Sequence, residues 1–199
     1  MGHRALLAYR RDDERSNSTV DADRSPDETD HSPDETDHSP DETPTYDLHR
    51  SHWGGAEFAL LDFVSPDSPY AADSQFAVDP EPIATDLALA DIAADHLNYL
   101  HHEAFYRVDS DYRPTAFHPV WFGLEIDSER VERSETVGHG ALLEAVPEET
   151  SFVRGWLRGT KAVVGEMVDR EALSPDEARD LLDERVRSWA DDREVVVPE

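Results

Sequence analysis

The amino-acid sequence predicts an α+β fold, namely a single domain with a mostly antiparallel sheet and a C-terminal helical hairpin. Three observations predict it: strand-like segments come first along the chain, two helical patterns follow each other near the C-terminus, and an acidic repeat interrupts the chain after its first strand. Strands first and helices later are typical of α+β domains. We see no strong βαβ alternation, so a doubly wound sheet is not expected.

Residues 3–10 and 46–53 are predicted to pair as an N-terminal β-hairpin. Residues 46–53 alternate between two faces, as is typical of a strand. One face carries Tyr46, Leu48, Arg50 and His52, and the other carries Asp47, His49, Ser51 and Trp53. Residues 12–43 lie between these two strands and contain the heptapeptide SPDETDH at 25–31 and 32–38, with a third start at 39–43. This segment holds 13 acids and two Arg, with Val20 as its single branched aliphatic residue. It lacks the apolar surface needed to offset the entropy of folding, so we predict a disordered acidic insertion in the hairpin.

The domain is therefore expected to comprise residues 1–11 and 44–191, with residues 192–199 as a C-terminal tail or a short strand. Within it, a short helix or strand is expected at 56–64, a connecting loop at 65–82, a helix at 85–100, and strands at 104–108, 115–126 and 138–146. Pro119 marks an edge, a bulge or a break in the second of these strands. Residues 152–157 fit either a strand or a helix.

Two helices are predicted near the C-terminus, at 160–171 and 175–191. The second begins with Ser174-Pro175-Asp176-Glu177, which supplies an N-cap, a proline at the first helical position and an early acid. The same four residue types open each acidic repeat, but there no apolar stripe follows them. A helix is therefore expected at Ser174 and not in the repeat.

The composition is strongly acidic, with 46 Asp plus Glu against 18 Lys plus Arg, a formal net charge of −28 and no Cys. All basic residues but Lys161 are arginine. This pattern predicts a halophilic protein that works at molar salt, where charge repulsion is screened over a few ångströms. It disfavours nucleic-acid binding, which needs a basic surface. The sequence has neither a membrane-spanning run nor an export signal, so we expect a cytoplasmic protein.

Chemistry is not assigned by any familiar motif, because phosphate loops, GxSxG and HExxH are all absent. The weak catalytic candidates are His52, His101, His102 and Glu103. The three histidines are also the candidate ligands of a divalent metal, since three nitrogen or oxygen ligands with an open position suit a catalytic ion. Ordinary half-buried histidines are the competing interpretation. No cofactor-binding residue is predicted.

Gly155, Gly159 and the tryptophans have structural interpretations. The spacing of the two glycines is interpreted as close packing. Trp53, Trp121 and the two tryptophans further along the chain are expected to lie in or near the core.

Several segments resemble an uncharacterised haloarchaeal protein family, a domain of unknown function. They are MGHRALLAY, YDLHRSHWGG, LHHEAFYRVD, WFGLE and KAVVGEMVDR. The resemblance covers residues 1–9 and, more loosely, 46–189, and in that family a short turn joins the first two strands. It implies a lineage and a compartment, but neither an activity nor a catalytic residue.

Two functions from different classes are compatible with the sequence. The first is a small non-enzymatic domain that binds a protein partner or assembles with itself. The second is a metal-dependent hydrolase built on the His and Glu candidates, which requires at least three of them to converge in a cleft. We favour the first, because no catalytic constellation is recognisable.

Overall fold

A seven-stranded sheet organises the computed structural model, which describes residues 3–11 and 43–198. Its strands are β1 (Arg4–Arg10), β2 (Tyr46–Ser51), β3 (Ala84–Leu87), β4 (His102–Val108), β5 (Pro114–Trp121), β6 (Gly140–Glu144) and β7 (Val195–Val196). Their order is β3-β2-β1-β4-β5-β6-β7, and β1 with β4 is the parallel pair among otherwise antiparallel neighbours. The predicted α+β class with a mostly antiparallel sheet is confirmed.

The N-terminal hairpin forms as predicted. β1 and β2 are paired from Ala5 opposite Ser51 to Arg10 opposite Tyr46, and the N–H of Arg11 donates to the carbonyl oxygen of Thr45 at 3.0 Å. The acidic insertion predicted at 12–43 lies outside the described residues, except for Thr43.

The interior strand β1 is buried on both faces, which explains its unbroken apolar sequence. Leu7 and Tyr9 point into a core that includes Phe58 from the loop after β2. Leu6 and Ala8 point into a second core on the opposite face. The sheet is therefore covered on both sides around β1.

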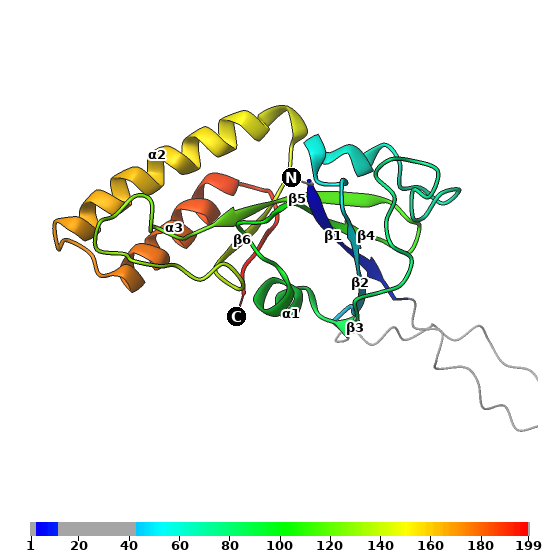
Figure 1. Ribbon diagram of the computed structural model, residues 1–199, viewed down its shortest axis with the longest axis horizontal. Coiled ribbons are helices and arrows are strands. Elements are labelled where there is room, and N and C mark those ends of the chain that lie inside the picture. Colours follow the sequence, from blue (N-terminus) through cyan, green and yellow to red (C-terminus); the bar gives the residue numbers. More distant parts are fainter. Residues whose placement is uncertain (1–2, 12–42, 199) are drawn as a thin grey trace, which may run out of the picture.

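Two long helices, α2 (Thr150–Asp169) and α3 (Pro175–Ala190), form the predicted hairpin. The N-cap of α3 is also confirmed, since the Ser174 hydroxyl accepts from the N–H of Glu177 and the Glu177 carboxylate accepts from the N–H of Ser174. Val164, Leu182 and Val186 pack in a third core with β6. In Figure 1 the two helices lie at the end of the molecule opposite β2 and β3.

The helix predicted at 85–100 is wrong in its extent. Its first residues form β3, which adds to the free edge of β2 with Leu87 opposite Tyr46. Only α1 (Leu89–Asp91) and the π-turn η3 (Ile92–His96) are helical. The apolar positions still reach the second core, because Ile92 and Leu97 are fully buried there. Strand pairing along the edge thus overrides the helical period.

The positions that the sequence left open are resolved as follows. Residues 56–61 form a 3₁₀ helix, η2 (Ala56–Leu61), in which Glu57 and Phe58 adopt positive φ angles of 48° and 57°. Residues 147–149 form η4 (Pro147–Glu149), and residues 152–157 belong to α2. Pro119 lies on the interior strand β5, opposite Leu142 of β6 and beyond the residues of β5 that pair with β4. Residues 195–196 form β7 instead of a tail.

Candidate functional site

The four catalytic candidates lie around the start of β4. His102 and Glu103 are its first residues, His101 comes directly before it, and His52 follows β2. His52 and His101 are exposed. The pairing of β4 with β1 is irregular at this point, since Arg4 lies opposite His102 and Ala5 lies opposite Ala104, so that Glu103 is the extra residue of a bulge.

Each partly buried candidate is engaged by a neighbour. The Glu103 carboxylate lies 2.7 Å from Nδ1 of His3, and Nδ1 of His102 accepts the N–H of Asn98 at 3.1 Å. Among residues 3–11 and 43–198, no three His, Asp or Glu side chains are placed to hold one metal ion. A catalytic or metal-binding role for the four candidates stays a prediction.

Two histidines are held in their neutral form by burial. Burial lowers the pKa of His102 to about 4 and that of His118 to about 4, because a charged imidazole would lose its hydration. His118 lies on β5 with its ring edge-on to Phe58, at 4.7 Å between centroids. Both side chains therefore contribute as packed, uncharged rings at neutral pH.

A groove between α2 and α3 has the features of a binding surface. Its volume is about 830 Å³, and we call it the hairpin groove. Its walls come from both helices and their connection: Gly155, Trp156, Gly159, Thr160, Val163, Val164, Met167, Leu173, Leu181 and Arg185. All but Thr160 and Arg185 are apolar or glycine, so the floor offers contact area and almost no hydrogen bonding.

The two glycines of α2 leave a depression along this surface. Within the part of the chain that the structure describes, a Cβ atom built on Gly155 or on Gly159 would meet no atom from outside its own helical turn within 4 Å. The expectation that these glycines serve close packing within the chain is therefore wrong. On either side of them, Phe152 and Val163 are 61% and 59% exposed. Single exposed apolar residues are common, but apolar residues that border one continuous apolar surface often mark an interaction site.

The same part of α2 is free of acids, in contrast with the rest of the chain. Residues 150–165 contain Arg154, Arg158 and Lys161 and neither Asp nor Glu. Arg154 and Arg158 are exposed, and the ion pairs found within the described residues involve neither of them. Lys161 instead turns inward, 4.5 Å from the ring centre of Trp121 and 3.8 Å from the Asp127 carboxylate.

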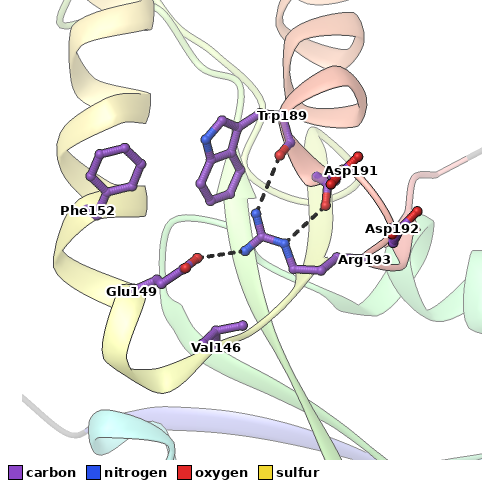
Figure 2. A pocket seen from close by; sticks show the side chains of 8 residues that line it. Val146, Glu149, Phe152, Trp189, Asp191, Asp192 and Arg193 are labelled. Carbon is purple, nitrogen blue, oxygen red and sulfur yellow. Dashed lines mark hydrogen bonds and ion pairs between the residues drawn. The ribbon is translucent and has the colours of Figure 1, made fainter.

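A second hollow of about 640 Å³ lies beside the ends of the two helices (Figure 2). Phe152 and Trp189 border it, and Arg193 reaches across it from the segment after α3. The Arg193 guanidinium lies 4.1 Å from the Trp189 ring centre, donates to the carbonyl oxygen of Ala190 at 3.1 Å and lies 3.2 Å from the Glu149 carboxylate. These contacts place a cation at the C-terminus of α3, where the helix dipole favours it.

Sequence reasoning missed the hairpin groove because it treated the glycines and tryptophans as packing residues. Trp53, expected in or near the core, is 50% exposed, whereas Trp121 is buried as predicted. The signal that was available is the acid-free stretch 150–165, which carries Phe152, Gly155, Gly159 and Val163 at helical spacing. In a chain of net charge −28, sixteen consecutive residues without an acid indicate a surface from which negative charge is excluded.

In the described ranges, neither α2 nor any shorter helix has an apolar stretch that could cross a bilayer. The model of a protein family described as "Family of unknown function (DUF6735)" matches residues 71–197. This range contains β4 to β7 and both helices of the hairpin groove, and it begins after β2. Comparison with curated proteins and with solved structures gave no match.

Proposed function

Because this chain belongs to the DUF6735 family, whose description carries no activity, we propose a function from its structure: it is a non-enzymatic, self-assembling domain. In the proposed assembly, α2 of one copy docks into the hairpin groove of a second copy. The observation that carries the proposal is the pair of uncovered glycines between two exposed apolar side chains on α2.

The shape of α2 is complementary to itself. Along its exposed face the order is Phe152, Gly155, Gly159 and Val163, that is, large, small, small, large. In an antiparallel pair centred between the two glycines, Gly155 of one copy lies opposite Gly159 of the other, and Phe152 lies near Val163. A two-fold interface requires this kind of self-complementary patch. Small residues at its centre let two helix backbones approach closely.

Charge favours the same face. Two copies with a net charge of −28 repel each other over most of their surfaces, and the acid-free part of α2 is a place where that repulsion is small. Helix α3, the other wall of the groove, holds five acids, among them the exposed Glu184. A second α2 laid in the groove would bring the Arg154 and Arg158 edge toward Glu184, the acid next to Arg185 of the groove lining. Such complementarity fixes orientation more than it adds affinity.

The self-assembly is tested by the molar mass of the protein in solution. We expect the wild type to elute as a dimer by size-exclusion chromatography with light scattering, and Gly159→Gln to weaken the dimer at least about tenfold, a difference of 1.4 kcal/mol. Gly159→Gln suits the test because no atom from elsewhere in residues 3–11 and 43–198 lies within 4 Å of a Cβ built there, and glutamine favours a helix over glycine.

The matched control is Asp180→Gln, on an exposed position of α3 away from the residues that line the groove. It should leave the dimer intact, and circular dichroism should show both variants folded. A wild type that is monomeric at roughly 100 μM, well above typical dissociation constants of specific dimers, contradicts the proposal. So does a Gly159→Gln variant as dimeric as the wild type.

We further propose that the assembly works at molar salt in a haloarchaeal cytoplasm. The support is the charge of the chain and the use of arginine at every basic position except Lys161. At about 1 M salt the Debye length falls to about 3 Å, so charge then favours this face only through groups that come into direct contact.

A further inference from the structure

At the other end of the molecule, four aromatic rings surround a small hollow of about 160 Å³. Tyr9 comes from β1, His49 from β2, Tyr70 from the loop after η2, and Tyr112 from the turn between β4 and β5. The ring centre of Tyr9 lies 5.0 Å from that of His49, 5.3 Å from that of Tyr70 and 6.3 Å from that of Tyr112. We call this cluster the tyrosine cage. None of its rings belongs to the hairpin groove.

The cage is rigid at its base. The Tyr9 hydroxyl donates to the carbonyl oxygen of Pro69 at 2.6 Å, and Nδ1 of His49 lies 2.9 Å from the carbonyl oxygen of Asp79. A carbonyl oxygen can only accept, so His49 donates from Nδ1 and its ring orientation is fixed. Both rings are buried. The surface they present therefore does not depend on a ligand.

The outer wall is set by a tight turn. Oδ1 of Asp109 accepts the N–H groups of Asp111 and Arg113 at 2.9 and 2.8 Å, and Tyr112 between them adopts a φ of 57°. This conformation directs the ring of Tyr112 to the hollow, where it remains 37% exposed. A non-glycine residue with positive φ costs conformational energy, and the two hydrogen bonds of Asp109 hold it.

The lining combines aromatic rings with carboxylates, which suits an organic cation. Ring faces attract positive charge through their quadrupole, and Asp47 and Asp109 add carboxylates at the rim. Burial raises the pKa of Tyr9 and that of Tyr70, so both hydroxyls remain protonated and the rings stay neutral.

We propose that the tyrosine cage binds a quaternary ammonium headgroup. The rings of Tyr70 and Tyr112 contact its methyl groups above the buried Tyr9, and Asp109 supplies the counter-charge, because the Asp47 carboxylate already pairs with Arg11 at 3.2 Å. Arg10 also lines the hollow and is exposed. A ligand that carries a carboxylate beside its ammonium group would pair with that guanidinium.

The test titrates the full-length protein with choline, trimethylglycine and free trimethyl-lysine, followed by ligand-observed NMR. The neutral control is 3,3-dimethylbutanol, which replaces the nitrogen of choline by carbon. We expect saturable binding of at least one cation, and binding of the neutral analogue weaker by about tenfold, as cation–π attraction requires. Tighter binding of trimethylglycine than of choline would show that Arg10 pairs with the carboxylate of the ligand. Tighter binding of trimethyl-lysine would indicate that the natural ligand is a methylated lysine of another protein.

Two variants of Tyr112 distinguish a loss of ring contacts with the ligand from a general disturbance of the fold. Tyr112→Phe keeps the ring and should keep binding, whereas Tyr112→Leu should lose about tenfold in affinity. Because Tyr112 is partly exposed in a turn, neither change disturbs the core. Three results would each overturn the proposal: no saturable binding at roughly 50 mM cation, far above a useful affinity; equal binding of 3,3-dimethylbutanol; or full binding by a folded Tyr112→Leu.

Discussion

Trp156 of α2 and Trp189 of α3 stack with their ring centres 5.0 Å apart and their planes 22° apart. Trp156 lines the hairpin groove and Trp189 lines the neighbouring hollow, so this pair separates the two surfaces and ties the helices together. Phe152 extends the pair, with its ring centre 6.0 Å from that of Trp189. The groove therefore depends on the aromatic contact that holds α2 beside α3.

The stacked pair is expected to stabilise the folded state. Trp189→Leu removes both aromatic contacts and the ring under Arg193, and should lower the free energy of unfolding by about 2 kcal/mol. Urea denaturation at high salt measures it. Trp53→Leu is the control, because half of Trp53 is exposed, and should cost less than about 0.5 kcal/mol. Equal losses of unfolding free energy in the two variants would show that the stacked pair stabilises the fold no more than a half-exposed tryptophan does.

Acid should destabilise the domain through its buried histidines. The pKa of His118 is about 4 in the folded chain and 6.5 when unfolded, so the unfolded state binds more protons between these values. The stabilising contribution, about 3 kcal/mol, is complete above pH 6.5 and is lost as the pH falls toward 4.

The measurement compares unfolding free energies at pH 7 and pH 4.5 for the wild type and His118→Met. The variant should lose less stability on acidification than the wild type. His52→Gln, at an exposed position, is the control and should follow the wild type. A pH dependence unchanged in His118→Met would mean that this imidazole is not the titrating group.

Low salt should unfold the chain. With a net charge of −28, moving from about 2 M to about 0.05 M KCl lengthens the screening distance several-fold and restores repulsion between acids. Circular dichroism should show a cooperative loss of structure, and NaCl at equal ionic strength should prevent it. A domain that remains folded in dilute buffer would refute the halophilic interpretation of the composition.

The acidic repeat should be dispensable for folding. Replacing residues 12–43 by a two-residue turn should change the unfolding free energy at high salt by about 1 kcal/mol or less, because loop-closure entropy varies only logarithmically with length. The pairing of β1 with β2 is already complete where the insertion begins, at Arg11 and Thr45. Urea denaturation of the shortened chain checks this, and a large loss of stability would assign the repeat a structural role.

The elements best predicted from sequence are those whose pattern and end signals agree. The capped helix at Ser174 has both a capping box and an apolar stripe, and β1 and β2 have strand periodicity on both sides of a long acidic insertion. The helix at 85–100 was overpredicted because its period could not reveal that β2 has a free edge. That information lies in the pairing of Tyr46 with Leu87, which are far apart along the chain.

The candidate sites were less predictable for the same physical reason. A histidine count could not show that Glu103 engages His3, nor that His102 receives the Asn98 N–H. The tyrosine cage is formed by four segments of the chain, and the sequence spacing of Tyr9, Tyr70 and Tyr112 does not predict that their rings meet. The hairpin groove is local to two consecutive helices, and its acid-free stretch was visible in the sequence.

The contact between two α2 helices is tested most directly by a single engineered cysteine. The chain contains no cysteine, so Gly159→Cys introduces the one thiol of the molecule, at a position that no other part of the described chain contacts. Mild oxidation at high salt should convert most of this variant into a disulfide-linked dimer on a non-reducing gel, because a disulfide requires Cα atoms within about 7 Å. Asp180→Cys should stay monomeric under the same conditions. If Gly159→Cys cross-links no faster than Asp180→Cys, the proposed assembly through the hairpin groove is wrong.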